Sequence, residues 1–185
     1  MNTVVVIASI AIAVLAVLFL IATFNRLVRL RNRAENSWAQ IDVQLRRRAD
    51  LVPNLVESVR AYAAHERETF QAVTEARAQV GRARTIEQRA EAENALTAAL
   101  GRLLAVAEAY PELRATEQFQ DLQRQLAETE EKLAVSRQVY NDTVLTYETA
   151  RETFPTNLLA GMLGFGPREY FEVEGAAREA PQVKF

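Results

Sequence analysis

The sequence predicts an all-α protein, with an N-terminal transmembrane helix followed by an antiparallel up-and-down four-helix bundle and a docked C-terminal tail. An uncharged apolar run opens the chain, and apolar residues then recur at helical spacing. No segment alternates apolar and polar residues as a half-buried strand would. We divide the 185 residues into an anchor (1–24), a helical bundle domain (25–154) and a tail (155–185) docked on the bundle or near the membrane.

The apolar run extends from Thr3 to Phe24 and contains no charged residue. At a rise of about 1.5 Å per residue, a helix of this length spans roughly the ~30 Å hydrocarbon core of a bilayer. A cleaved signal peptide has a cationic segment before its apolar stretch and a small-x-small cleavage site after it, and neither is present here. We therefore expect an uncleaved, single-pass membrane anchor.

Four arginines follow the anchor, at Arg26, Arg29, Arg31 and Arg33. Arginines near the end of a transmembrane helix tend to remain cytoplasmic. This distribution predicts an N-terminus outside the membrane and a cytoplasmic domain. The same side chains are candidate contacts for anionic lipid head groups, although their role in topology is sufficient to explain them.

Composition limits the chemistry that the chain can perform. The sequence contains no cysteine, which excludes disulfides, thiolate nucleophiles and cysteine-based metal sites. The net charge of −2 gives no general attraction to nucleic acid, so we expect no nucleic-acid partner.

The first helix of the domain is expected to continue directly from the anchor, because no glycine or proline occurs from residue 25 to residue 51. Its apolar residues recur every three or four positions and predict one buried stripe. The stripe comprises Leu27, Leu30, Ala34, Trp38, Ile41 and Leu45.

Pro53 predicts a break in the helix. Proline lacks the backbone N–H group and is tolerated best in a first helical turn, and Asp50 is a good N-cap three residues earlier. We therefore expect a break near Ala49–Asp50 and a second helix that extends to about Arg84. The alternative is one long kinked helix, because the seven-residue phase continues from Leu45 to Val52.

Later breaks are marked by glycine, proline and a capping residue. Gly81 and Thr85 are expected to end the second helix and begin the third, which stops at Tyr110–Pro111. The fourth helix carries a heptad-like apolar seam, typical of a coiled coil, and ends at Pro155.

The tail is apolar and rich in glycine, and we expect a short helix near residues 157–163. Four helices of alternating direction would return the tail to the membrane, whereas three would place it at the far end. The candidate lipid or partner contacts in the tail are Leu158, Leu159, Met162, Leu163 and Phe165.

Several motifs, read together, resemble those of the LemA family of bacterial membrane proteins. They are Trp38-x-Gln40-Ile41, Arg48-x-Asp50-Leu51-Val52-Pro53-Asn54-Leu55, Tyr62 with His65-Glu66, Ala109-Tyr110-Pro111, Arg137 before Tyr140-Asn141, Phe154-Pro155-x-Asn157, Tyr170-Phe171-Glu172 and Pro181-x-Val183-x-Phe185. The resemblance implies a single anchor, a four-helix bundle and location in the bacterial cytoplasmic membrane, and it implies no activity. The chain departs from the family at Tyr147-Glu148, where members often carry a second Tyr-Asn pair.

No catalytic set emerges from the sequence. The single histidine, His65, begins a sequence like HExxH, but Thr69 occupies the position of the second zinc ligand. We therefore expect no catalytic residues, metal or cofactor, and no enzymatic activity. The polar residues of the sharpest motifs, among them Arg48 and Asn141, are expected to cap helices or to form buried hydrogen bonds.

The leading hypothesis is a non-enzymatic interaction scaffold at the membrane. The alternative is a lipid-surface or envelope sensor whose apolar tail contacts the bilayer. Membrane lipid is a partner through the N-terminal helix in both cases. Protein partners are expected but are not identified by the sequence, and a homo-oligomer is possible.

Overall fold

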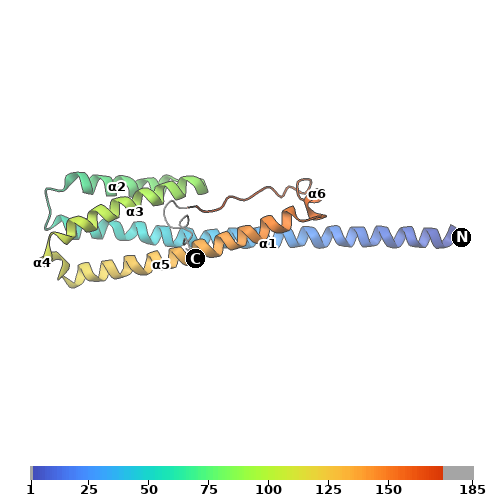
Figure 1. The fold of residues 1–185 in the computed structure, drawn as a ribbon, viewed down its shortest axis with the longest axis horizontal. Helices are drawn as coiled ribbons and strands as arrows, with labels where there is room; N and C mark the ends of the chain where they lie inside the picture. Colours follow the sequence, from blue (N-terminus) through green and yellow to red (C-terminus); the bar gives the residue numbers. More distant parts are fainter. Residues whose placement is uncertain (1, 173–185) are drawn as a thin grey trace, which may run out of the picture.

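The computed structural model describes residues 2–172, and every regular element in them is a helix (Figure 1). The six helices in residues 2–172 are α1 (Asn2–Arg60), α2 (Arg67–Arg82), α3 (Ile86–Glu108), α4 (Pro111–Arg114), α5 (Glu117–Glu152) and α6 (Thr156–Ala160). The all-α prediction is therefore confirmed for the described residues.

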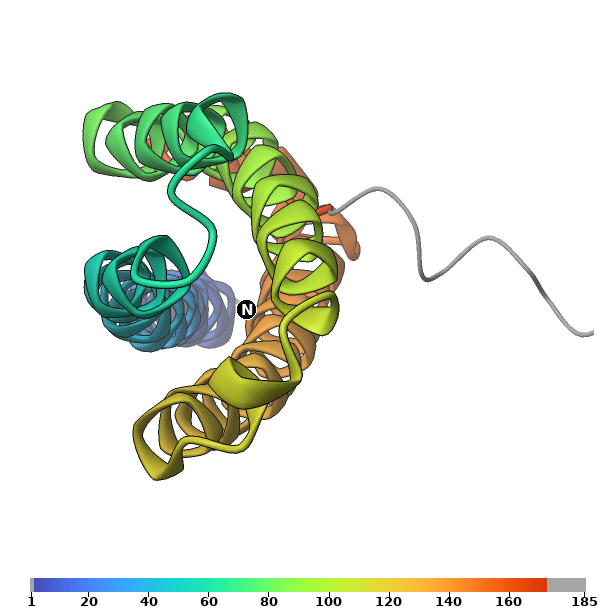
Figure 2. The same cartoon turned by 90° about the vertical axis from the view of Figure 1, so that its left-hand side faces the viewer.

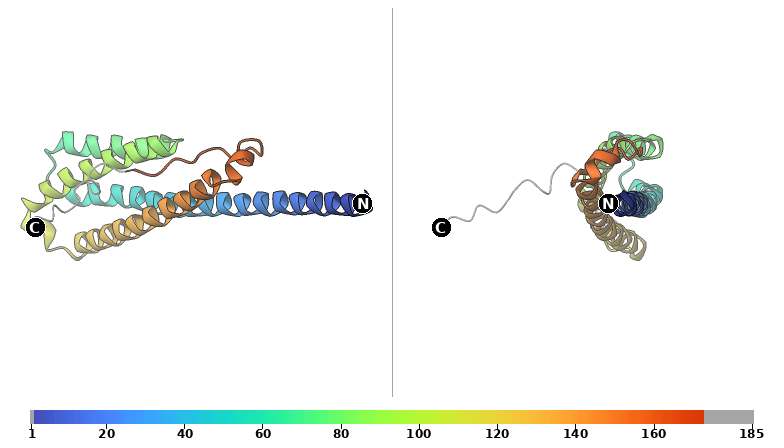
Figure 3. Two further views of the ribbon diagram at one scale, coloured as in Figure 1. Left: turned by 45° about the vertical axis from the view of Figure 1, so that its right-hand side comes forward. Right: turned by 90° about the vertical axis from the view of Figure 1, so that its right-hand side faces the viewer.

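The helices form two antiparallel pairs. The long helices α1 and α5 pair with each other, and α2 and α3 form a shorter hairpin against the C-terminal part of α1 (Figures 1 and 3). Seen along the long axis, α2, α3 and α5 lie in an open arc around α1 (Figure 2). The closed up-and-down four-helix bundle is thus not confirmed, because α1 makes close contacts with α2, α3 and α5, whereas α3 and α5 approach each other little.

α1 is one helix of 59 residues that contains Pro53, so the predicted break near Ala49–Asp50 is wrong. A proline inside a helix leaves the carbonyl oxygen four residues earlier without its N–H partner. Here that acceptor is the Ala49 carbonyl, and the Arg77 Nε atom of α2 donates to it at 2.8 Å. A side chain from a neighbouring helix therefore replaces the hydrogen bond that Pro53 removes.

The real break lies at residues 61–66, where the sequence has neither glycine nor proline. The apolar stripe is interrupted here, because Ala63 is the only buried residue between Val59 and Phe70. The chain reverses in this turn, so α1 leads away from the N-terminal end, α2 returns, α3 leads away and α5 returns (Figure 1). The alternative of one helix that continues through Pro53 is confirmed. Its expected consequence, a domain of only three helices, is wrong because the turn at residues 61–66 separates α2 from α1.

The other boundaries follow recognisable caps. The Thr85 hydroxyl accepts a hydrogen bond from the Gln88 N–H at 3.1 Å, which confirms Thr85 as the N-cap of α3. Thr116 caps α5 in the same way, and Pro111 occupies the first turn of α4. α5 ends at Glu152, three residues before the predicted stop at Pro155.

The buried apolar residues form three clusters along the molecule. The distal core, farthest from the N-terminus, joins the C-terminal part of α1 to α2, α3 and the start of α5. The proximal core consists of the other two clusters, which join α1 to α5, α6 and the tail. The predicted stripe on α1 is confirmed, since Leu27, Ile41 and Leu45 are fully buried and Ala34 nearly so.

Candidate functional site at the N-terminal end of the domain

The N-terminal part of α1 is long and apolar enough to cross a membrane. Its most apolar 18-residue window has a mean hydropathy of 3.3, and none of that window is buried. The first buried residue among residues 3–60 is Thr23, which is 7% exposed. The apolar run and the folded domain therefore meet at residues 23–24, and a bilayer would satisfy the side chains that the protein leaves uncovered.

α6 lies beside α1 at this junction (Figure 1). The turn that follows α6 ends in a Schellman motif, in which the Phe165 N–H bonds the Ala160 carbonyl at 2.9 Å and the Gly164 N–H bonds the Gly161 carbonyl at 3.2 Å. Gly164 has φ of 77°, the left-handed conformation that this motif requires. The motif reverses the chain and directs Phe165 against α1, where its ring centroid lies 5.5 Å from that of Phe24.

The predicted tail contacts divide into two groups. Leu158 and Met162 are 63% and 86% exposed, Leu163 is also exposed, and Leu159 is half-buried. Phe165 is 3% exposed, so its prediction as a surface contact is corrected. Its ring is buried because Leu27 and the C-terminal part of α5 provide an apolar surface for it.

The four arginines after the apolar run differ in their exposure to solvent. Arg31 is half-buried and its guanidinium lies 5.4 Å from the Phe165 ring centroid, within cation–π range. Arg26, Arg29 and Arg33 are exposed. At 100° per residue they lie about 140–160° around α1 from Arg31, so the domain carries apolar side chains on one flank of α1 and three cations on the other.

The tail after α6 runs beside α5 and is held by two pairs of side chains. In the distal clamp, defined as Tyr140 and Asn141, the Tyr140 hydroxyl donates to the Glu169 carbonyl at 2.8 Å. The Asn141 amide bonds both backbone groups of Phe171: its oxygen accepts from the N–H at 2.9 Å and its nitrogen donates to the carbonyl at 3.2 Å. Asn141 thus forms hydrogen bonds as expected, but it is half-buried and bonds the tail backbone instead of a neighbouring helix.

The proximal clamp, defined as Tyr147 and Glu148, repeats this arrangement one heptad later. The Tyr147 hydroxyl donates to the Gly166 carbonyl at 2.7 Å, and the Glu148 Oε1 atom accepts from the Arg168 N–H at 2.6 Å. The second carboxylate oxygen of Glu148 accepts from Arg151 Nε at 2.7 Å. The Glu148 carboxylate thus accepts the backbone hydrogen bond that an asparagine side-chain oxygen would accept. It has no N–H group to donate to the tail, and its second oxygen instead forms an ion pair with Arg151.

The spacing of the two clamps along α5 matches the spacing of the backbone groups that they bind on the tail. They are seven residues apart on α5, which is about 10.5 Å of helix, and they bind groups three residues apart on the tail. Three residues of extended chain cover about 10 Å. A heptad repeat of tyrosine followed by an amide or carboxylate therefore matches an extended backbone that runs antiparallel to the helix.

Phe171 fills the apolar site at the end of this tail segment. Its ring centroid lies 5.5 Å from that of Trp38, which in turn lies 5.4 Å from the Tyr140 ring. The Arg137 guanidinium lies 5.5 Å from the Phe171 ring centroid. Aromatic contacts of this kind add to simple area burial, so Phe171 is the main apolar anchor of the tail.

The tyrosines of both clamps are held in the neutral form. Burial raises the pKa of Tyr140 to about 12; the charge of Arg168 lowers this pKa by a smaller amount, and the charge of Glu169 raises it. Burial, followed by the negative charge of Glu148, raises the pKa of Tyr147. Both hydroxyls therefore remain hydrogen-bond donors across the physiological range.

A polar layer separates the two cores. It is defined by Arg48 of α1, Glu93 of α3, and Glu130 and Arg137 of α5. Arg48 and Glu93 are 2% and 0% exposed and form an ion pair, and Arg137 reaches the same carboxylate at 3.3 Å. Arg48 also pairs with Glu130. Sequence reasoning identified Arg48 as a buried hydrogen-bonding residue but missed Glu93, which sits among several glutamates with no local feature to distinguish it.

The charges of the polar layer are nearly balanced. Burial lowers the pKa of Arg48 and of Arg137, and the charge of Glu130 opposes the shift in both. An arginine stays protonated despite such a shift, so the layer consists of two cations paired with two anions. The ion pairs of the layer join α1 to α3, α1 to α5 and α3 to α5. They therefore fix the positions of these three helices along their axes relative to one another.

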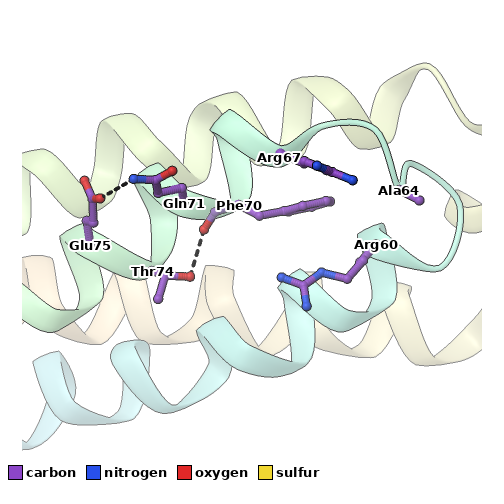
Figure 4. A pocket seen from close by; sticks show the side chains of 7 residues that line it. All are labelled: Arg60, Ala64, Arg67, Phe70, Gln71, Thr74 and Glu75. Atoms are coloured by element: carbon purple, nitrogen blue, oxygen red, sulfur yellow. Dashed lines mark hydrogen bonds between the residues drawn. The ribbon is translucent and has the colours of Figure 1, made fainter.

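An open pocket lies at the end of the domain that is farthest from the N-terminus. Arg60, Arg67 and Phe70 line an open pocket of about 580 Å³, with the Arg60 guanidinium 5.1 Å from the Phe70 ring centroid (Figure 4). His65 lies in the adjoining turn and is exposed. Within residues 2–172, no group of three or more histidine, aspartate and glutamate side chains is arranged to hold a metal ion.

Together, the fold and this junction define a protein that is all-helical over residues 2–172, where one helix is long and apolar enough to span a membrane and continues into the folded domain. The chain belongs to the LemA family, whose model matches residues 37–185. It is 28% identical over 206 residues to the magnetosome proteins MamQ 1 and MamQ 2 of Paramagnetospirillum magneticum, covering 95% of this chain and 75% of each relative. It is 26% identical over 203 residues to the magnetosome protein MamQ of Magnetospirillum gryphiswaldense, covering 94% of this chain and 74% of that protein.

Proposed function

We propose that this protein is a non-enzymatic interaction scaffold, anchored in the bacterial cytoplasmic membrane by residues 3–24. The observation that carries the proposal is the continuity of α1, which makes the anchor and the first helix of the domain a single rod. Such a rod holds the domain at a fixed height and rotation relative to the bilayer. A scaffold needs this geometry to present one face to partners in or near the membrane.

The available partner surface lies on the outward faces of α1 and α5. Val43 and Val135 are 59% and 58% exposed, and Leu145 is 56% exposed, all beyond the membrane junction. The relatives' association with magnetosomes supports a role at a membrane.

Photocrosslinking in intact membranes tests the scaffold directly. A photoreactive amino acid is placed at Val43, Val135 or Leu145 in the full chain, and adducts are identified by mass spectrometry. We expect one face to capture the same proteins repeatedly. Adducts that contain only this protein would contradict the scaffold and favour a self-assembling structural role.

Orientation is a separate part of the proposal. The position of Arg26, Arg29 and Arg33 supports an external N-terminus and a cytoplasmic domain. Alkaline phosphatase fused after Phe185 should be inactive, because the enzyme requires export. An active fusion would place the domain on the other side of the membrane.

A second candidate function is a lipid-surface or envelope sensor. It is favoured by the exposed apolar side chains of α6, which the scaffold does not require. A sensor would change conformation with the composition of the bilayer, whereas a scaffold would not. Hydrogen exchange of the tail in vesicles of different lipid composition separates the two.

A further inference from the structure

We infer that α6, with the preceding Phe154 and the turn that follows, is an interfacial lipid-contact site whose apolar side chains enter the bilayer beside α1. The inference rests on the membrane anchoring proposed above, and it assigns a second contact between the domain and the lipid. Its first support is position. The Phe165 ring that ends this segment packs on Phe24, the last residue of the apolar run, so α6 lies at the height where the hydrocarbon core ends.

The second support is exposure. Phe154, Leu158 and Met162 are 75%, 63% and 86% exposed, and Leu163 is exposed beside them. Four large apolar side chains within ten residues form a concentrated patch, whereas the exposed apolar residues of α1 and α5 beyond the junction are scattered. Water is a poor environment for such a patch, and the acyl-chain boundary is a favourable one.

The third support is charge. Residues 153–167 contain no charged side chain, although a quarter of all residues in the chain are charged. This segment can therefore approach the hydrocarbon core without desolvating an ion. The backbone at its end is internally bonded through the Schellman motif, which lowers the cost of leaving water there.

The fourth support is rigidity. α6 has only five residues and would not form a stable amphipathic helix alone. It is held from both sides: α5 precedes it, and the two clamps fix the tail that follows. A bilayer is the occupant that this geometry selects, because the anchor fixes the membrane plane at the height of the patch.

The test uses single cysteines in the full chain, which contains no native cysteine. Leu158→Cys and Met162→Cys report on the patch, and Val43→Cys and Val135→Cys are controls of similar exposure to Leu158. Ile21→Cys, within the apolar run, marks full lipid contact. Each variant is labelled with an environment-sensitive fluorophore and reconstituted into phosphatidylcholine vesicles that carry a nitroxide near the head-group end of the acyl chain.

We expect the lipid nitroxide to quench the labels at 158 and 162 several-fold more than those at 43 and 135, with iodide in the water showing the opposite order. Equal quenching at all four positions would overturn the lipid-contact site. Circular dichroism of each variant confirms that the helices are intact. Protein adducts from the photocrosslinking experiment are independent of this result, so failure of the lipid contact and failure of the scaffold are distinguishable.

Discussion

The distal and proximal cores hold the same helix, α1, by different means. The distal core is dominated by aliphatic side chains on regular helices. The proximal core packs an extended tail through two rings, Phe165 and Phe171, and through hydrogen bonds from α5 side chains to the tail backbone. Regular helices satisfy their own backbone groups, whereas an irregular segment needs side chains to do so.

This difference explains why the motifs Tyr140-Asn141 and Tyr170-Phe171-Glu172 occur in the proximal region. Aliphatic packing tolerates exchange of similar side chains, so the distal core can be built from many sequences. The clamps require a tyrosine followed by an asparagine or a carboxylate at a fixed spacing. The polar layer stands between the two regions, and its disruption is expected to have the largest effect.

Replacing Glu93 by alanine should destabilise the whole domain by about 3–5 kcal/mol, because the buried Arg48 and the half-buried Arg137 lose their common partner. Glu130 pairs with the same Arg48 but its side chain is 41% exposed. Glu130→Ala should therefore cost less, roughly 1.5–3 kcal/mol, because it removes one charge-assisted hydrogen bond from buried Arg48 while Glu93 remains. Urea unfolding in detergent micelles, followed by circular dichroism, measures both. Similar losses for the two variants would contradict the assignment of Glu93 as the centre of the layer.

Removing the Phe171 ring should release the tail and leave the distal core intact. A Phe→Ala change at a buried site costs about 3–5 kcal/mol, and here the loss should appear as faster hydrogen exchange at residues 166–171. Tyr170→Ala is the matched control, since this neighbouring side chain is 40% exposed. Exchange that accelerates equally in α2 and α3 would show that the two cores are one cooperative unit.

The effects of replacing Arg77 and Pro53 on the free energy of unfolding should depend on each other. Arg77→Met removes the donor to the Ala49 carbonyl and should cost roughly 1–1.5 kcal/mol. In a Pro53→Ala background the residue at position 53 supplies its own N–H group, and the same change should cost much less. A double-mutant cycle on the free energy of unfolding measures this coupling. A coupling energy of zero would mean that the contact does not compensate for the proline.

Alkaline pH should loosen the distal clamp. The pKa of Tyr140 is raised from 10 to about 12 in the folded protein, so the neutral hydroxyl is the form that folding favours. Its stabilisation is complete below pH 10 and is lost as the pH rises from 10 through about 12. Tyrosinate absorbance at 295 nm should show late-titrating tyrosines, and Tyr140→Phe should remove one of them. Titration of every tyrosine near pH 10 would contradict the buried hydrogen bond.

Sequence reasoning predicted the features that depend on local periodicity and caps. The stripe from Leu27 to Leu45 and the cap at Thr85 are examples, because each depends on neighbours within a few turns. It failed at Pro53, since the compensating Arg77 lies 24 residues away and belongs to another helix. It also missed the turn at residues 61–66, which is marked only by a gap in the apolar stripe.

The candidate site was harder to predict than the fold. The apolar residues of the tail were identified, but only the folded chain separates buried Phe165 from exposed Leu158 and Met162. The seven-residue spacing of Tyr140 and Tyr147 was visible in the sequence. Its meaning depends on the extended tail that the clamps bind, and no local pattern predicts that pairing.

The continuity of α1 from the anchor into the domain is the central claim. Spin labels on Val17→Cys, within the apolar run, and Glu57→Cys, both at exposed positions, report the distance across the junction and across Pro53. A continuous helix predicts a single narrow distribution centred at about 60 Å between the two backbone positions, measured by pulsed electron resonance in lipid nanodiscs. A distribution that is substantially shorter, or broad with several maxima, would show that the helix breaks and that the domain moves independently of its anchor.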